Sequence, residues 1–198
     1  RNIGNKNPIA SQALDLLNRA FQGETVMVPP IWSNVALSPS SEGKSRAAAA
    51  MFFAAPIKND QGAVIAVIAQ RVDPSKDFSR IIQLGRIGKS GETYSFNQYG
   101  KLLSESRFDK DLHKAGLISE NEKSILSISV RNPGGDMTKG FVPSIPRYQQ
   151  PLTLMAQEAT QGKSGLNVTG YRDYRGVPVY GAWLWDDNLD IGLTTEID

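Results

Sequence analysis

A pattern that occurs at both ends of the chain constrains the fold more than any other feature. Each copy runs from a short helix that stops at a Gln-Gly pair, through three strands, to an aliphatic-Asp pair. The closing pairs are Val72-Asp73 in the first copy and Ile197-Asp198 in the second. Because a helix followed by three turn-connected strands is one compact unit, the repeat predicts two related lobes.

The first lobe is expected within residues 1–84. Apolar spacing and turn residues predict a helix at Pro8–Phe21, a strand at Thr25–Ile31, a loop at Ser33–Lys44, a hairpin at Ala47–Val72 and a short helix at residues 73–84. This copy lacks a hairpin in front of its helix. We expect the missing part to precede Arg1.

The second lobe, residues 85–198, is expected to be complete. The predicted elements are a hairpin at Glu92–Ser106, a helical turn near Leu112, a strand at Ile125–Val130, a helix at Pro151–Gln161 and three strands at residues 166–174, 177–185 and 189–197. A hairpin, a helical crossover and three strands give a five-stranded antiparallel sheet. The predicted fold class is therefore α/β (α+β), with flanking helices on each sheet.

Composition excludes several classes of protein. Hydrophobic residues make up 40% of the chain, which is enough for a packed core. The net charge is only +2, and no long basic run is present, which argues against nucleic-acid binding. The chain has no cysteine, so disulfides and thiolate metal sites are excluded. The longest apolar stretch, Ala47–Ile57, is shorter than the about 20 residues that a membrane-spanning helix needs.

The sequence offers little for catalysis, and we predict no catalytic residue, no metal site and no cofactor. The single histidine, His113, lies among Lys and Asp residues and is interpreted as part of a solvated helix surface. Asp186, Asp187 and Asp190 are oxygen donors of the kind that bind hard cations, but their spacing is typical of a turn. The region is therefore interpreted as non-enzymatic.

The predicted order of elements resembles a PAS-like sensor lobe. Two such lobes in tandem are similar to the double Cache domains of bacterial transmembrane receptors. The stretches that carry the resemblance are Phe52-Phe53-Ala54-Ala55-Pro56-Ile57, Gly91-Glu92-Thr93-Tyr94, Ser104-Glu105-Ser106-Arg107-Phe108, residues 170–179 and Thr195-Glu196-Ile197-Asp198. Together they lie within residues 8–108 and 151–198.

The resemblance implies an extracytoplasmic ligand sensor in the periplasmic or extracellular part of an inner-membrane protein. It also implies membrane helices on both sides of this region, a small-molecule ligand (an organic acid or an amine) and a cytoplasmic effector. A histidine kinase is the effector we expect; the alternatives are a chemoreceptor signalling domain and a cyclic-nucleotide enzyme. A ligand-free periplasmic interaction module is the competing function, and a homodimer is left open.

Candidate ligand-binding residues in the first lobe surround the alanine-rich strand. Trp32 and Phe52 are expected to form walls of a pocket, and Arg46 is expected to hold a carboxylate, for which a surface arginine is the alternative. The alanines either leave volume for a ligand or admit a closely packed helix.

In the second lobe, the candidates lie at strand ends: Tyr94, Arg107, Tyr171 and Asp173. Tyr171 and Asp173 are expected on one face of a strand, with Arg172 and Tyr174 on the other. Asp173 has two predicted roles, a ligand contact or an ion pair with Arg107 or Arg175. Trp183 and Trp185 share a face and are interpreted as core residues.

Overall fold

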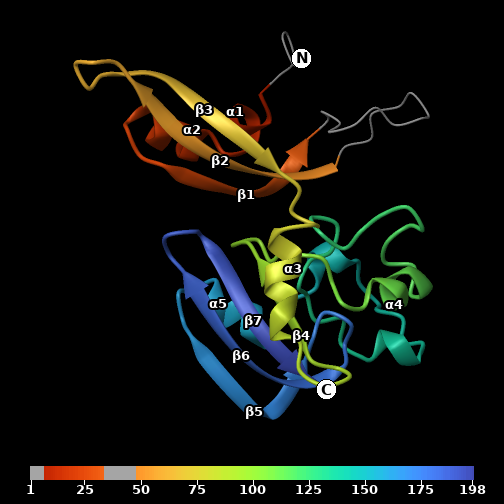
Figure 1. Cartoon of the computed structure of the whole chain (residues 1–198). Coiled ribbons are helices and arrows are strands. Elements are labelled where there is room, and N and C mark those ends of the chain that lie inside the picture. Colours follow the sequence, from red (N-terminus) through yellow and green to blue (C-terminus); the bar gives the residue numbers. More distant parts are fainter. Residues whose placement is uncertain (1–6, 34–47) are drawn as a thin grey trace. The chain divides into compact units, whose positions relative to one another are not determined.

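A computed structural model describes residues 7–33 and 48–198 of the chain. The chain divides into two compact units, residues 1–77 and 78–198 (Figure 1). The sequence predicts a boundary after residue 84. The short helix α3 (Phe78–Ile82) belongs to the second unit, where Ser79 Oγ accepts a hydrogen bond of 2.9 Å from the Glu105 amide.

The first unit is an antiparallel sheet with two helices on one face. Its elements are α1 (Pro8–Gln12), α2 (Leu14–Phe21), β1 (Val26–Ser33), β2 (Ala48–Lys58) and β3 (Val64–Val72), and the strand order is β1-β2-β3. The predicted hairpin is confirmed. The predicted helix is broken at Ala13, whose backbone (φ −149°, ψ 50°) is not helical.

The alanines of β2 admit a close helix rather than leaving empty volume. Ala50 is fully buried in a cluster with Ile9 of α1, and Ala54 is fully buried in a cluster with Ala20 of α2. Because alanine has only a methyl group, the helices approach the strand closely on this face. The second of the two interpretations of these alanines is therefore confirmed.

The second unit contains a four-stranded antiparallel sheet in the order β4-β7-β6-β5. Its elements are α3, η1 (Gln83–Gly85), β4 (Glu92–Phe96), α4 (Asp109–Lys114), η2 (Met137–Lys139), η3 (Arg147–Gln149), α5 (Leu154–Ala159), β5 (Gly165–Arg172), β6 (Pro178–Asp186) and β7 (Ile191–Ile197). The sequence places a hairpin first and a three-stranded meander last, and this pairing brings the first and last strands of the unit, β4 and β7, together. The predicted α+β class with antiparallel sheets is confirmed.

The second strand of the predicted hairpin at Glu92–Ser106 is reduced to isolated bridges. Leu102 pairs with Phe96, and Lys101 pairs with Ser129 on the other side. The strand predicted at Ile125–Val130 is also absent from the structure. Leu126 has a left-handed backbone (φ 59°), which turns the chain there instead of extending it.

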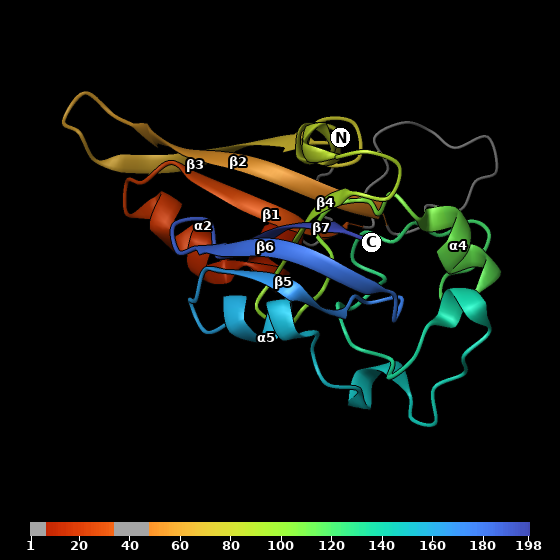
Figure 2. The same ribbon diagram turned by 90° about the horizontal axis from the view of Figure 1, so that it is seen from below.

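The segment between β4 and β5 packs on one face of this sheet, where α5 contacts β5 and β6 (Figure 2). The core on that face is aromatic. Tyr94, Phe96 and Tyr174 are fully buried, and Trp183 is buried as predicted. This inner face carries the candidate site.

Candidate functional site

Two buried glutamates lie directly opposite each other on the inner face of the second unit. Glu92 of β4 pairs with Glu196 of β7 in the sheet register, and each side chain is about 3% exposed. Each glutamate lies two residues from another buried residue of its strand and therefore on the same, buried face. Both carboxyl groups thus point into the core. Buried carboxyl groups need hydrogen-bond partners, and each glutamate has its own set.

Glu196 is held by two tyrosines. Tyr94 Oη donates to Glu196 Oε2 at 2.8 Å, and Tyr171 Oη donates to Oε1 at 2.6 Å. Burial raises the pKa of Glu196 to about 8, and the charges of Asp173 and Glu92 act in the same direction. The hydrogen bonds from the tyrosines oppose this shift only in part.

Glu92 links β4 by hydrogen bonds to Ser106, Arg107 and Tyr174, which lie outside the strands. Its Oε1 accepts from Ser106 Oγ at 2.8 Å and from the Arg107 amide at 2.6 Å, and its Oε2 accepts from Tyr174 Oη at 2.7 Å. Ser106 Oγ and Tyr174 Oη are also 2.6 Å apart, which closes a three-membered network. Burial raises the pKa of Glu92 above its ordinary value, although these donors act against the shift.

Asp173 organises the turn between β5 and β6. Its Oδ1 accepts from the amides of Arg175 (2.8 Å) and Val177 (2.9 Å), and its Oδ2 accepts from Arg175 Nε at 2.6 Å. The guanidinium of Arg175 also lies 3.5 Å from the ring centroid of Phe108. Of the two predicted ion-pair partners of Asp173, the structure therefore selects Arg175.

Arg107 lies at the end of the glutamate network instead of pairing with Asp173. Its Nη1 donates to the carbonyl oxygen of Gly91, and its Nη2 donates to that of Gly88 at 3.1 Å. The side chain is partly exposed. Arg107 thus closes the loop before β4 and presents a guanidinium edge near the network.

The predicted face of Tyr174 is wrong. Tyr171 and Asp173 are both buried, and Tyr174 is buried with them instead of sharing the other face with Arg172, which is exposed. The reason is that β5 ends at Arg172, so strand alternation stops before Tyr174. The turn then directs the Tyr174 ring into the core, 5.4 Å from the Tyr94 ring.

In the first unit, the register separates two residues that were expected to line one pocket. Trp32 pairs with Ala49, whereas Phe52 pairs with Val28. Since Ala49 and Phe52 are an odd number of residues apart on β2, Trp32 and Phe52 lie on opposite faces. Phe52 belongs to the helix-side core, and Trp32 is 40% exposed. Arg46 lies outside the described residues.

Sequence reasoning missed Glu92, Glu196 and Ser106 as members of this site. A usable signal was present in the strand patterns. Glu92 precedes Tyr94 and Phe96 at a spacing of two residues, and Glu196 follows Thr194 at the same spacing. Residues spaced by two share one face of a strand, so each glutamate occupies a core-facing position. A charged residue at such a position is uncommon unless it has a buried partner.

The network is a hydrogen-bonded core, without the arrangement of an acyl-transfer site. Ser106 is hydrogen-bonded to a carboxylate and a phenol, whereas His113 lies on α4, half-buried, with Nδ1 unpartnered. The expectation of a solvated His113 is thus only partly met. Within residues 7–33 and 48–198, no group of three or more metal-ligating side chains comes together. The predicted turn role is confirmed for Asp186, whose Oδ1 accepts two amides.

No family model and no curated protein sequence matches the chain. Solved structures do match it. The periplasmic sensory domain of the Campylobacter jejuni chemoreceptor Tlp1 is similar with a TM-score of 0.51 and 15% identity, over 96% of this chain and 56% of that one. The extracellular domain of mmHK1S-Z3, named a histidine kinase, is similar with a TM-score of 0.50 and 14% identity, over 91% of this chain and 51% of that one.

A third similar structure is the ligand-binding domain of the Pseudomonas aeruginosa amino-acid chemoreceptor PctC in complex with GABA. Its TM-score is 0.50 and its identity 11%, over 99% of this chain and 65% of that one. The chain thus spans about half to two thirds of the length of these domains. In the described part of the chain, no helix has the length and hydropathy needed to cross a bilayer. The resemblance is confirmed at the level of the fold: the chain has the fold of periplasmic and extracellular sensory domains of histidine kinases and chemoreceptors.

Proposed function

We propose that this chain is an extracytoplasmic ligand-sensing region of a transmembrane receptor in an inner membrane. The observation that carries the proposal is the pairing of β4 with β7 in the sheet order β4-β7-β6-β5, with the helical crossover packed on its inner face. Solved sensory domains of receptors share this fold. The region would bind a small molecule and pass a conformational shift to a cytoplasmic histidine kinase.

The route for that shift is the last strand. β7 lies between β4 and β6 and carries Glu196 near its end. Arg175 Nη2 lies 3.7 Å from Asp198 Oδ1, and Ser90 Oγ donates to the Asp198 carbonyl oxygen at 2.9 Å. A change in the turn at Asp173 or in the glutamate network would therefore reach the end of β7 directly. A ligand shifts this equilibrium only as far as it prefers one state.

The proposed ligand contacts differ in how accessible they are. Trp32 and Arg107 have exposed surface and can meet a ligand as they stand. Phe52 is buried in the first unit, and Tyr94, Tyr171 and Asp173 are buried in the second. These four would contact a ligand only if it displaced their present partners. Arg46 keeps its proposed role as a carboxylate-binding residue.

A ligand-free interaction module is the second candidate, and one observation favours it. The inner face of the second unit is filled by aromatic rings, and both glutamates have their hydrogen bonds satisfied. A sheet with a filled inner face can act as a rigid structural module. The two candidate functions differ in one measurable property: a sensor binds a small molecule, and an interaction module does not.

A thermal-shift screen of the full chain tests for a ligand. The probes are GABA, the standard amino acids, organic acids and aliphatic amines. A sensor should gain stability with one chemical class; at 100 times Kd the gain is about 2.7 kcal/mol. Trp32→Ala should weaken a ligand that contacts the first unit, and exposed Tyr148→Ala serves as the control. A uniformly flat screen favours the interaction module.

The effector is tested by fusing the region, with its own flanking segments, to a reporter histidine kinase. If the proposal holds, a ligand from the screen changes the output of the kinase. If output changes only in a chemoreceptor or cyclic-nucleotide-enzyme fusion, the kinase assignment is wrong while ligand sensing stands.

A further inference from the structure

Two cationic side chains of the second unit, those of Lys101 and Arg147, donate hydrogen bonds to the main chain around Ser129, and a third, that of Arg131, donates to the Gln150 carbonyl group. Lys101 forms a bridge with Ser129, and its Nζ donates to the Ser127 carbonyl oxygen at 3.3 Å. Arg147 Nη1 donates to the Ser129 carbonyl oxygen at 2.9 Å and to that of Arg131 at 3.4 Å. Lys101, Arg131 and Arg147 are here called the cation cluster.

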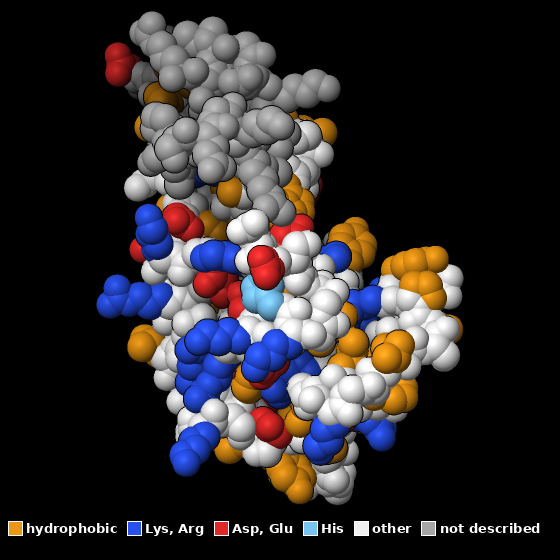
Figure 3. Space-filling model, turned by 90° about the vertical axis from the view of Figure 1, so that its right-hand side faces the viewer, with side chains coloured by type: hydrophobic (Ala, Val, Ile, Leu, Met, Phe, Trp, Pro, Cys, Tyr) orange, Lys and Arg blue, Asp and Glu red, His pale blue; other side chains and the backbone are white. Residues whose placement is uncertain are grey.

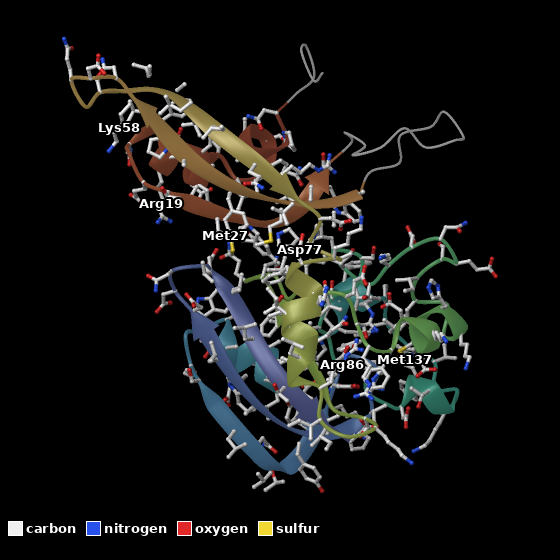
Figure 4. All side chains as sticks on the ribbon, viewed as in Figure 1. Arg19, Met27, Lys58, Asp77, Arg86 and Met137 are labelled. Carbon is white, nitrogen blue, oxygen red and sulfur yellow. The ribbon has the colours of Figure 1, made fainter. Side chains whose placement is uncertain are left out.

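Among the described residues, no member of the cation cluster forms an ion pair. Their hydrogen bonds go to main-chain carbonyl groups: Arg131 Nη1 donates to Gln150, and Arg147 Nη2 donates to Tyr174 at 2.9 Å. Arg147 Nη2 also lies 3.9 Å from Sδ of Met137, which is labelled in Figure 4. Carbonyl dipoles orient these cations without neutralising them.

The charges of the cluster act against one another. Burial lowers the pKa of Lys101, and the charges of Arg147 and Arg131 lower it further. Burial also lowers the pKa of Arg147 to about 10; Tyr174 and Asp173 oppose the shift, and Arg131 adds to it. In addition, Arg147 Nε is buried without a hydrogen-bond partner. Such repulsion costs free energy that a bound anion would return.

Two members of the cluster still have donors that reach solvent. Lys101 and Arg131 are partly exposed. Each uses one hydrogen bond to a carbonyl group, which leaves N–H groups on the ammonium and on the guanidinium. Figure 3 shows a face of the protein on which Lys and Arg side chains gather.

We propose that Lys101 and Arg131, together with the partly buried Arg147, bind a small multivalent oxyanion, either an organic di- or tricarboxylate or a phosphate. A guanidinium edge matches two oxygens of either group, and the ammonium supplies a second positive charge. Three cations fit a multivalent anion better than a monovalent one, and they repel amines. This site does not depend on the signalling role proposed above.

The competing interpretation is that the three cations only hold loop carbonyl groups in place. The two interpretations differ in what happens when one charge is removed. If the cations only hold carbonyl groups, removing Lys101 weakens the fold with or without an anion. If the cluster is an anion site, removing Lys101 relieves repulsion in the free protein and weakens anion binding.

The test is calorimetric titration and thermal unfolding of the full chain with citrate, succinate, inorganic phosphate and, as a cationic probe, spermidine. Ionic strength is held constant, because these salts also stabilise proteins by exclusion. We expect citrate or phosphate to bind at millimolar concentration or below and spermidine not to bind. The tighter of the two anions identifies a carboxylate or a phosphate site.

Lys101→Gln should weaken anion binding at least tenfold while leaving the anion-free unfolding temperature equal or higher. Arg131→Lys, which keeps the charge and loses the guanidinium fork, should also weaken it. The matched control is Lys163→Gln, because Lys163 is exposed and its Nζ donates to Gln161 Oε1 at 3.0 Å. Equal anion-induced stabilisation of Lys101→Gln and Lys163→Gln, or none in the unaltered protein, overturns the proposal.

Discussion

Glu92 and Glu196 are direct neighbours across β4 and β7, yet their carboxyl groups are bound by different side chains. Glu196 takes its hydrogen bonds from Tyr94 and Tyr171, whereas Glu92 takes its own from Ser106, Tyr174 and a main-chain amide. The two sheet-paired acids therefore connect different parts of the unit. Glu196 links three strands to one another, and Glu92 links the first strand to the crossover and to the β5–β6 turn.

Stability should fall as the pH rises through the titration of Glu196. Its pKa is raised from 4.5 to about 8, first by burial, so the native state binds a proton that the unfolded chain releases. The contribution of protonated Glu196 to native-state stability is complete below about pH 4.5 and is lost as the pH approaches 8. The change in unfolding free energy is on the order of several kcal/mol. Urea denaturation at a series of pH values measures it.

Glu196→Gln isolates this contribution because the amide does not titrate. The variant should gain stability relative to the unaltered protein as the pH rises from 4.5 to 8.5. Exposed Glu120→Gln is the control and should leave the pH profile unchanged. A difference between the Glu196→Gln variant and the unaltered protein that stays constant with pH would contradict the assignment.

Tyr174→Phe should destabilise the second unit by about 1–3 kcal/mol. The substitution keeps the buried ring but removes the hydroxyl that bonds to Glu92 and Ser106, leaving a buried carboxyl group short of a donor. Tyr180→Phe, on a half-exposed ring, is the matched control and should change little. Denaturant unfolding of both variants at one pH is the measurement, and equal effects would argue against the network.

Asp173→Asn should cost about 3–5 kcal/mol, because it leaves the buried guanidinium of Arg175 without its carboxylate at 2.6 Å. The exposed pair of Asp111 and Lys114, 3.8 Å apart, provides the control; Asp111→Asn should change stability by less than about 1 kcal/mol. Urea denaturation distinguishes the two. A small loss in Asp173→Asn would instead favour its alternative role as a ligand contact.

The strands were predictable because alternation of apolar and polar residues is a local signal that burial of one sheet face enforces. The break at Ala13 and the left-handed Leu126 were not, because alanine and leucine are not residue types that mark a turn. For the same reason, the strand predicted at Ile125–Val130 was wrong. Ile125, Ile128 and Val130 are buried, but along a turning chain.

The site was predictable in its tyrosines and in the ion pair of Asp173 with Arg175, but not in its glutamates. Tyr94 and Tyr171 attract attention as strand tyrosines, whereas Glu92 and Glu196 resemble ordinary surface glutamates until the sheet register places them together. The cation cluster was beyond sequence reasoning. Lys101, Arg131 and Arg147 are far apart in the chain and meet through irregular segments for which no periodicity exists.

Gly176→Ala should be among the most damaging single-methyl additions in the second unit. Gly176 has φ 83°, and a Cβ there would collide with the carbonyl oxygen of Gly135 and approach Pro133 Cγ to 2.9 Å. The backbone conformation alone costs an L-residue roughly 1–2 kcal/mol, and the collision adds to it. Gly116→Ala is the matched control, because Gly116 has φ 68° with nothing within 4 Å of the added atom.

The two alanine variants separate strain from contact. Gly116→Ala should lose only the conformational amount in denaturant unfolding, and Gly176→Ala should lose clearly more or fail to fold. Far-ultraviolet circular dichroism of Gly176→Ala, with and without a stabilising osmolyte, distinguishes a destabilised fold from a misfolded chain. Equal losses in the two variants would mean that the turn at Asp173 can move away from Gly135, and that the β5–β6 connection is less rigid than its hydrogen bonds imply.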